Sequence, residues 1–323
     1  MITSFKLFES NLEIEKICKD LGIEDFQIVD GLVNVAGDVN ISGRKLSGRK
    51  LTKIPVKFGR VEGYFYCHNN QLTHLEGTPR SVGGYFDCHN NQLTSLEGAP
   101  QSVGGDFGCS NNQLTHLEGA PRSVGGYFSC HNNQLTSLEG APQSVGGYFD
   151  CYNNQLTSLE GAPRSVGGHF YCNNNQLTHL EGGPQSVGGN FSCSDNQLTH
   201  LEGCPEIVDG DFICHNNQLT HLEGTPQSVG GNFYCNDNQL ASFRGIPEYS
   251  LNEDQEFYCE ENPIHEIYQL FKTPKCIDLI NEFEVIGNGQ ISRVRLEEVF
   301  LELGMEIPKN LKFKYYKLVG WYK

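Results

Sequence analysis

The sequence predicts a β-rich solenoid of about ten 21-residue units, with an N-terminal α/β cap and a C-terminal helical cap. Cysteines recur at a strict spacing of 21 residues, and each unit contains one short alternation of apolar and polar residues. Glycine is frequent (37), whereas methionine (2) and tryptophan (1) are rare, as expected for a chain built by copying one short unit. A fixed short period is typical of solenoids, in which each unit buries its apolar side against its neighbours. The evenly spaced cysteines are Cys67, Cys88, Cys109, Cys130, Cys151, Cys172, Cys193, Cys214 and Cys235.

Residues 1–58 are predicted to form the N-terminal cap. Residues 10–21 have the pattern of a helix, with Ser10 or Asn11 as its N-cap and Gly22 just past its end. The stretch FQIVDGLVNVAGDVNIS then predicts a hairpin that leads into a degenerate first repeat. Within that repeat, SGRKLSGRKL (residues 42–51) is a tandem duplication, and we expect its second copy to bulge out as an insertion.

Residues 59–267 are predicted to form the solenoid, and the unit YFDCHNNQLTSLEGAPQSVGG (residues 85–105) illustrates it. Phe86 and Cys88 alternate with polar neighbours, which indicates a short, half-buried strand. The GAP and GG segments supply turns on either side. Cys259 follows Cys235 after 24 residues, which indicates a three-residue insertion in the last unit.

The unit resembles the leucine-rich repeat. Phe86-x-Cys88-x-x-Asn91-x-Leu93-x-x-Leu96 matches the pattern LxLxxNxLxxL, and LEGAPQSV is similar to the back half of the short bacterial class known from type III secreted effectors. The resemblance implies a right-handed array with an inward asparagine ladder. Glycines such as Gly104 stand at the usual first leucine position, so we expect a tighter entry into the strand. The ladder residues are Asn70, Asn91, Asn112, Asn133, Asn154, Asn175, Asn196, Asn217, Asn238 and Asn262.

The layout of the chain also resembles repeat proteins encoded by tailed bacteriophages. Those proteins share a small N-terminal cap, near-identical repeats and a short helical tail. Here residues 268–323 are predicted to be the helical cap, from the periodicity of PIHEIYQLF, PKCIDLINEFEVI and ISRVRLEEVFLELG. This second resemblance implies a protein that acts in the cytoplasm of an infected bacterium, with a host enzyme or defence protein as its target.

Charge and cysteine usage narrow the classes of partner and compartment. The net charge of the chain is −16. Residues 59–247 contain 17 acidic residues and 5 basic residues, none of which is a lysine. Nucleic-acid binding depends on neutralising phosphates, so this middle region argues against it and favours a partner with a basic surface. The odd cysteine count (13), the absence of a signal-peptide pattern and the lack of an 18-residue apolar run predict a cytoplasmic location.

Adjacent cysteine and histidine residues, as in Cys88-His89, raise the question of thiol catalysis or zinc binding. Neighbouring side chains on a strand point to opposite faces, so each cysteine is expected inside and each histidine outside. Cys276-Ile277-Asp278 resembles the Cys-x-Asp site of repeat-bearing ubiquitin ligases, but the large catalytic domain of that family is missing here. We therefore predict no catalytic residues, no metal site and no cofactor.

Other chemistry stays open at the level of sequence. A cation could lie along the repeated glutamates of the LEG segments, and stacked thiols could capture a soft metal. The basic residues between Arg44 and Lys57 could contact a small anion or nucleic acid.

The outward strand positions vary between copies, whereas the core, turn and ladder positions barely change. Tyr, His, Asp, Ser and Asn dominate there, a mixture typical of binding surfaces, although polar β-formers are also tolerated at such positions without function. We predict a non-enzymatic scaffold that binds a protein on this face; sequestration of a small molecule or nucleotide on the same face is the alternative. The predicted contact residues are Tyr64, Tyr66, His68, Tyr85, Asp87, His89, Tyr127, His131, Tyr148, Asp150, Tyr152, His169, Tyr171, Asp211, His215 and Tyr234.

Overall fold

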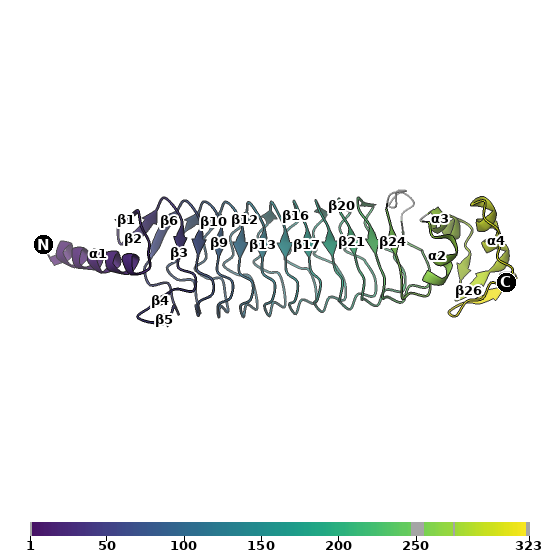
Figure 1. Ribbon diagram of the computed structural model, residues 1–323, viewed down its shortest axis with the longest axis horizontal. Coiled ribbons are helices and arrows are strands. Elements are labelled where there is room, and N and C mark those ends of the chain that lie inside the picture. The colour runs from purple at the N-terminus through teal and green to yellow at the C-terminus, as the bar shows by residue number, and fades with distance from the viewer. Residues whose placement is uncertain (1, 247–254, 274, 321–323) are drawn as a thin grey trace. The chain divides into compact units, whose positions relative to one another are not determined.

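The computed structural model describes residues 2–246, 255–273 and 275–320. Two compact units can be distinguished: Met1–Asn175 with Gly182–Pro184, and Gln176–Glu181 with Gln185–Lys323. Both contain the same β-solenoid turn, repeated every 21 residues, which confirms the predicted fold (Figure 1).

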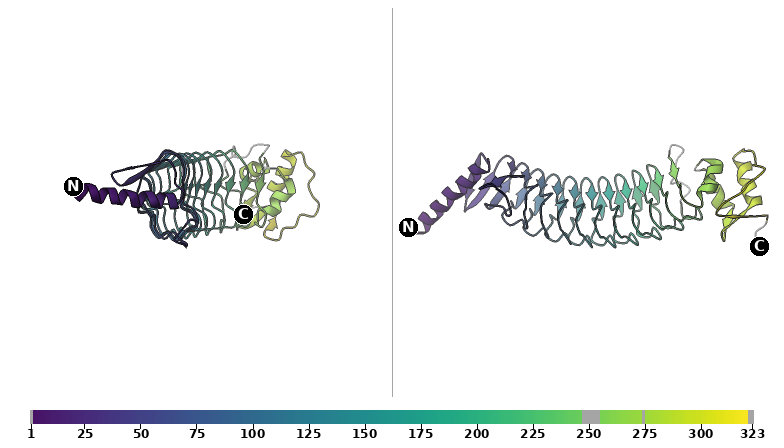
Figure 2. Two further views of the ribbon diagram at one scale, coloured as in Figure 1. Left: turned by 60° about the vertical axis from the view of Figure 1, so that its left-hand side comes forward. Right: turned by 60° about the horizontal axis from the view of Figure 1, so that its bottom comes forward.

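Each turn contributes two short strands, one to each of two parallel sheets, whereas the sequence predicted one strand per turn. We call the sheet of Ser–Val strands the Val sheet and the sheet whose repeat strands begin with phenylalanine the Phe sheet. Within each unit, strands of successive turns lie side by side in both views of Figure 2. In the first unit the Val sheet has the order β1 (Phe26–Val29), β2 (Leu32–Val35), β6 (Phe58–Val61), β8 (Ser81–Val82), β10 (Ser102–Val103), β12 (Ser123–Val124), β14 (Ser144–Val145) and β16 (Ser165–Val166). Its Phe sheet has the order β3 (Val39–Asn40), β7 (Phe65–Tyr66), β9 (Phe86–Asp87), β11 (Phe107–Gly108), β13 (Phe128–Ser129), β15 (Phe149–Asp150) and β17 (Phe170–Tyr171).

The second unit continues the same turn and ends in a mixed α/β segment. Its Val sheet holds β18 (Ser186–Val187), β20 (Ile207–Val208) and β22 (Ser228–Val229), and its Phe sheet holds β19 (Phe191–Ser192), β21 (Phe212–Ile213), β23 (Phe233–Tyr234) and β24 (Phe257–Tyr258). Three helices follow: α2 (His265–Phe271), α3 (Lys275–Glu282) and α4 (Arg293–Glu302). A small sheet of β25 (Ile286–Gly287), β26 (Gln290–Ser292) and β27 (Lys317–Val319) accompanies them.

The C-terminal segment therefore differs from the purely helical cap that the sequence predicted. β26 and β27 pair in parallel although 24 residues separate Ser292 from Lys317, and such non-local pairing leaves no local periodicity. The segment packs on the last turns of its own unit, where the Asn281 side chain donates to the carbonyl of Phe243 at 3.1 Å. The Tyr316 hydroxyl donates to the carbonyl of Ala241 at 3.0 Å. The three-residue insertion before Cys259 falls on residues 247–254 and lies outside the described residues.

At the N-terminus, helix α1 (Ile2–Asp20) begins earlier than predicted, so the N-cap expected at Ser10 or Asn11 is wrong. Its predicted end is confirmed, because Gly22 adopts a left-handed φ of 70° just past the helix. The predicted hairpin is also confirmed, since β1 and β2 pair antiparallel across Asp30 and Gly31.

The duplicated SGRKL segment forms a hairpin of its own. β4 (Lys45–Leu46) and β5 (Arg49–Lys50) pair antiparallel and make a separate two-stranded sheet. Ser47 and Gly48 both have positive φ, as a tight two-residue hairpin turn requires. The insertion thus leaves the solenoid path without interrupting it. The hairpin uses residues of both copies, and Leu51 of the second copy is buried, so the expectation that the second copy alone bulges out is wrong.

The core of the solenoid repeats one apolar set in every turn. In one turn, Val124, Phe128, Cys130, Leu135 and Leu138 are all buried. The phenylalanines of successive turns stack, with ring centroids 5.2 Å apart for both the Phe86–Phe107 and Phe107–Phe128 pairs. Each fully buried phenylalanine or leucine contributes about 1.5–3 kcal/mol, so the repeat itself supplies the driving force for folding.

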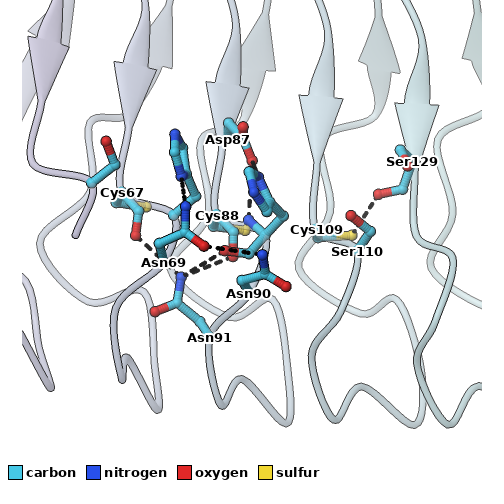
Figure 3. Close-up of polar contacts among 12 residues, drawn as sticks. Cys67, Asn69, Asp87, Cys88, Asn90, Asn91, Cys109, Ser110 and Ser129 are labelled. Atoms are coloured by element: carbon cyan, nitrogen blue, oxygen red, sulfur yellow. Dashed lines mark hydrogen bonds and ion pairs between the residues drawn. The ribbon is translucent and has the colours of Figure 1, made fainter.

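The two adjacent asparagines of each turn have different structural roles. Figure 3 shows one such pair, Asn90 and Asn91. Asn90 adopts a left-handed φ of 51°, a conformation that asparagine tolerates better than most residues. Asn91 is the predicted ladder residue: its amide donates to the carbonyls of Cys67 (3.1 Å) and Cys88 (3.0 Å). Its carbonyl accepts the backbone N–H of Leu72 at 2.9 Å. Because these partners lie in two successive turns, the ladder joins each turn to the one before it.

The glycine after each Ser–Val strand allows the turns to approach closely, which confirms the tight strand entry expected from the sequence. A Cβ atom on Gly125 would lie 2.1 Å from the carbonyl oxygen of Gly104 in the preceding turn. No real Cβ contact is that short, so only glycine fits at this position.

Substituting Gly125→Ala is expected to lower the free energy of unfolding by about 2 kcal/mol, because overpacking typically costs 1–3 kcal/mol. Urea denaturation followed by circular dichroism would measure the loss. Gly37→Ala is the matched control, since nothing lies within 4 Å of a Cβ at Gly37. Equal stability of the two variants would contradict the close-approach explanation.

Candidate binding surface

The outward positions of the Phe sheet form a continuous face within the first unit, which we call the outer face. It has three columns: the residue before each buried phenylalanine, the residue between phenylalanine and cysteine, and the residue after cysteine. In the turn of Phe128 and Cys130, the side chain of Tyr127 is 45% exposed, whereas Phe128 and Cys130 are fully buried. Ser129 and His131 are half-buried on the same side as Tyr127. The predicted separation of cysteine and histidine onto opposite faces is confirmed.

The core cysteines have the properties of structural residues. All thirteen cysteines are free thiols. Burial raises the pKa of Cys88 and of Cys130 well above the ordinary value, so these thiols stay protonated near neutral pH. Cys276 is likewise buried on α3, and burial raises its pKa as well. The features that activate a cysteine nucleophile, exposure and a lowered pKa, are lacking in these three thiols.

A cysteine and a histidine that are not adjacent in the sequence meet in the second unit. The sulfur of Cys259 lies 3.7 Å from Nδ1 of His265. Burial raises the pKa of Cys259, which keeps the thiol neutral beside the imidazole. Sequence reasoning missed this pair because His265 belongs to α2 and not to the repeat.

Aromatic side chains gather into two clusters on the outer face of the first unit. The first aromatic cluster surrounds Asp87 and contains Tyr64, Tyr66, His68, Tyr85 and His89. Tyr64 stacks on Tyr85 with ring centroids 4.7 Å apart, and His68 stacks on His89 at 4.4 Å.

The second aromatic cluster surrounds Asp150 and contains Tyr127, His131, Tyr148, Tyr152, His169 and Tyr171. His131 stacks on Tyr152 at 4.5 Å, and Tyr148 contacts His169 at 4.4 Å. One turn without aromatic side chains at these positions separates the two clusters, with Asp106, Gly108 and Ser110 in the three columns. The structure therefore brings thirteen of the sixteen predicted contact residues together on one unit, in two groups.

Two exposed tyrosines of the first column, Tyr85 and Tyr148, lie flat along the sheet. A Cβ on Gly105 would meet the ring of Tyr85 at 2.4 Å, and one on Gly168 would meet the ring of Tyr148 at 2.4 Å. The ring of one turn thus covers the glycine of the next, which holds the tyrosine in one orientation. Tyr148 nevertheless stays 47% exposed. Rigid, half-exposed tyrosines of this kind bind partners at low cost in side-chain entropy.

Each cluster contains one carboxylate paired with a histidine. Oδ1 of Asp87 lies 2.6 Å from Nδ1 of His89 in the same turn. Oδ2 of Asp150 lies 3.1 Å from Nδ1 of His131 in the preceding turn. No lysine or arginine occupies any of the three columns from Tyr64 to Asn173, so the outer face carries negative charge among aromatic rings.

The remaining predicted contact residues, Asp211, His215 and Tyr234, belong to the second unit. Asp211 takes part in a ladder between turns: its Oδ1 accepts the backbone N–H of Asn232 at 2.8 Å. Its Oδ2 accepts the Asn190 amide at 3.3 Å, so this carboxylate has a structural role that the sequence did not reveal. Tyr234 stacks on Tyr258 at 4.6 Å. Sequence reasoning missed Tyr258 because the insertion shifts it out of the 21-residue register.

Other candidate chemistry receives no support from the geometry. No group of three or more His, Cys, Asp or Glu residues within residues 2–246, 255–273 and 275–320 has the arrangement needed to hold a metal ion. Within the repeated glutamates, Glu76 pairs with Lys57 at 3.4 Å and Glu223 with Arg244 at 2.7 Å, both on the exposed surface. No helix in the described part of the chain is both long and apolar enough to cross a membrane.

Two solved structures are similar to this chain in fold. The chain is similar to YopM from Yersinia enterocolitica WA-314, with a TM-score of 0.54 and 23% sequence identity over 70% of this chain. It is also similar to YopM from Yersinia pestis, described as a leucine-rich effector protein, with a TM-score of 0.52 and 24% identity over 70% of this chain. The fold is that of a leucine-rich-repeat solenoid.

This leucine-rich-repeat solenoid spans 47% of the first YopM chain and 60% of the second. No protein-family model and no curated protein sequence matches the chain. The similarity therefore concerns the fold, and the residues of the outer face have to be interpreted on their own chemistry.

Proposed function

We propose that this leucine-rich-repeat solenoid is a non-enzymatic scaffold that binds a protein partner on the outer face of its first unit. The supporting observation is the pair of aromatic clusters, in which tyrosines lie half exposed and held in place above glycines. Tyrosine is enriched at binding hot spots because it offers a large contact area and a hydroxyl group on a rigid side chain. The carboxylates between the rings favour a partner with a basic surface.

The sequence layout resembles that of phage repeat proteins, and we extend the proposal to where the protein acts and what it binds. In that setting the chain acts in the cytoplasm of an infected bacterium, and the partner is a host protein such as an enzyme or a defence protein.

The triple substitution Tyr127→Ala, Tyr148→Ala and Tyr171→Ala is expected to abolish capture of the partner and to change the melting temperature by no more than a few degrees. The reason is that these rings lie on the surface and contribute contact area to the partner more than packing to the core. A benzoylphenylalanine photo-crosslinker at Tyr85, an exposed residue of the outer face that both triple variants keep, followed by mass spectrometry, would identify the captured protein and measure the loss.

The matched control is Glu97→Ala, Glu118→Ala and Glu139→Ala, which removes three exposed side chains from the same unit away from the outer face. Capture that survives the tyrosine substitutions would contradict the proposal, as would equal loss in both triple variants.

Sequestration of a small molecule or nucleotide remains the second candidate on the same face. Neighbouring rings such as His68 and His89 already stack on each other, so a planar ligand would have to bind at the open end of a stack. A nucleotide that raises the melting temperature of the purified protein, with no protein captured at Tyr85, would favour this alternative.

A further inference from the structure

The two aromatic clusters are two copies of one arrangement, a carboxylate bordered by rings. Tyr85 and His89 flank Asp87 along the strand, and Tyr66 pairs with Asp87 across the sheet. In the second cluster, Tyr148 and Tyr152 flank Asp150 along the strand, and Tyr171 pairs with Asp150 across the sheet.

The carboxylates are partly accessible and influence the rings beside them. The side chain of Asp87 is 25% exposed and that of Asp150 is 21% exposed. Burial raises the pKa of the Tyr66 hydroxyl, and the nearby negative charges, Asp38 and Asp87 among them, raise it further. The Tyr66 hydroxyl therefore stays neutral beside the Asp87 carboxylate.

A cationic side chain suits this combination better than any other protein group. A guanidinium or ammonium group is attracted to the faces of aromatic rings and to a carboxylate at the same time. Arginine suits it best, because its planar guanidinium stacks on rings and donates two parallel hydrogen bonds to a carboxylate. The columns of the outer face from Tyr64 to Asn173 contain neither lysine nor arginine. The basic side chains that contact these carboxylates are histidines, His89 at Asp87 and His131 at Asp150, and each leaves the second carboxylate oxygen to an incoming guanidinium.

The spacing of the two carboxylates defines the partner further. Asp87 and Asp150 occupy the same column three turns apart. Parallel strands lie about 4.8 Å apart, so the two carboxylates are separated by about 14 Å. An extended chain rises about 3.4 Å per residue, and four residues therefore cover that distance. Between them in this column, Gly108 offers no side chain and Ser129 only a small one, which leaves room for a backbone to cross.

We propose that the outer face recognises an extended basic segment of the partner in which two arginines stand four residues apart, one bound at Asp87 and the other at Asp150. This inference rests on the proposed function and specifies the chemistry of the partner. The extended segment runs across the strands, so its side chains provide the recognition and its backbone need not join either sheet.

Synthetic peptides would test the spacing directly. The probes are fluorescein-labelled Gly/Ser peptides with two arginines at positions i and i+4, with two arginines at i and i+2, or with one arginine. A fourth peptide carries citrulline, which is neutral but similar in shape, in place of both arginines at i and i+4. Fluorescence anisotropy with the full chain at low salt is expected to show at least tenfold tighter binding of the i, i+4 peptide than of the single-arginine peptide. The citrulline peptide is expected not to bind.

The variants Asp87→Asn and Asp150→Asn are each expected to reduce the affinity for the i, i+4 peptide to that of the single-arginine peptide. Glu118→Gln is the matched control, because it removes one negative charge from the exposed glutamates and is expected to leave the affinity unchanged. Equal affinity for all spacings, tight binding of the citrulline peptide, or no effect of either aspartate substitution would overturn the inference. The citrulline comparison uses the unaltered protein and stays decisive if an aspartate variant does not fold.

Failure of this inference can be separated from failure of the proposed function. If the peptides are not discriminated but the triple tyrosine variant still loses the crosslinked partner, the scaffold function stands and the arginine pair is wrong. If the triple tyrosine variant still captures the partner, the outer face is not the binding surface and both proposals are wrong.

Discussion

Raising the pH from 8 to 10 is expected to unfold the solenoid, with a midpoint at about pH 9.5, because its core thiols are buried as neutral groups. Burial raises the folded-state pKa of each of these thiols above its value in the unfolded chain. The stability they contribute is therefore complete below the unfolded pKa of about 8.5 and is lost as the pH rises above it. The eight thiols concerned are Cys67, Cys88, Cys109, Cys130, Cys151, Cys193, Cys214 and Cys235.

The expected effect is large because the contributions of the individual thiols to the free energy of unfolding add. Each thiol that ionises only in the unfolded chain lowers the free energy of unfolding by about 1.4 kcal/mol per pH unit. Eight of them give about 11 kcal/mol per pH unit, which is comparable with the whole stability of a typical domain. Urea denaturation at a series of pH values, with a reductant present throughout, would measure the slope.

The variant Cys88→Ala provides the control for this explanation. It removes one buried thiol, so its free energy of unfolding is expected to fall less steeply above pH 9, by about 1.4 kcal/mol per pH unit. A wild-type stability that does not change between pH 8 and 10, or a slope that Cys88→Ala leaves unchanged, would show that the thiols ionise in the folded state.

Substituting Asn133→Ala is expected to lower the free energy of unfolding by about 4 kcal/mol, because each buried group left without a partner costs about 1–3 kcal/mol. The Asn133 amide donates to the carbonyls of Cys109 at 3.1 Å and Cys130 at 3.0 Å. Its carbonyl accepts the backbone N–H of Leu114 at 3.0 Å. Alanine would leave these backbone groups of two successive turns unsatisfied inside the solenoid. Urea denaturation of the full chain would measure the loss.

The neighbouring residue supplies a matched control. Asn132 has a φ of 54° and an amide that bonds to Asn111 at the surface. Asn132→Gly keeps the left-handed backbone accessible and removes two exposed amide bonds, the one to Asn111 and the one that Asn153 donates, so we expect a change of less than about 1 kcal/mol. Similar losses in the two variants would show that the ladder amide has no special role.

Most of the solenoid could be predicted from the sequence because its determinants repeat. The 21-residue period, the burial of Phe86 and Cys88 and the outward position of His89 all follow from alternation and spacing. The ladder role of Asn91 followed from the resemblance to the leucine-rich repeat. The structure confirms each of these.

Three features escaped prediction for a shared physical reason. The repeat strands of the Val sheet, such as Ser123–Val124, are two residues long and carry one buried residue each, so they show no period of their own. The left-handed conformation of Asn90 shows only in the backbone, and the pairing of β26 with β27 joins segments distant in the chain. Each of these features depends on pairing between distant residues or on a backbone dihedral angle, and neither is visible in the order of neighbouring residues.

The repeat alone specifies which residues face the core and which face outward, because alternation along a strand is a local property. Only the folded chain distinguishes the outward residues that are engaged between turns from those left to meet a partner. Asp211 and Asp87 are both outward aspartates, but Asp211 accepts hydrogen bonds from its neighbouring turns, whereas Asp87 bonds to His89 of its own turn and lies among half-exposed rings. That difference arises from side chains that are about 21 residues apart in sequence and one strand spacing apart in space, so packing between turns decides it.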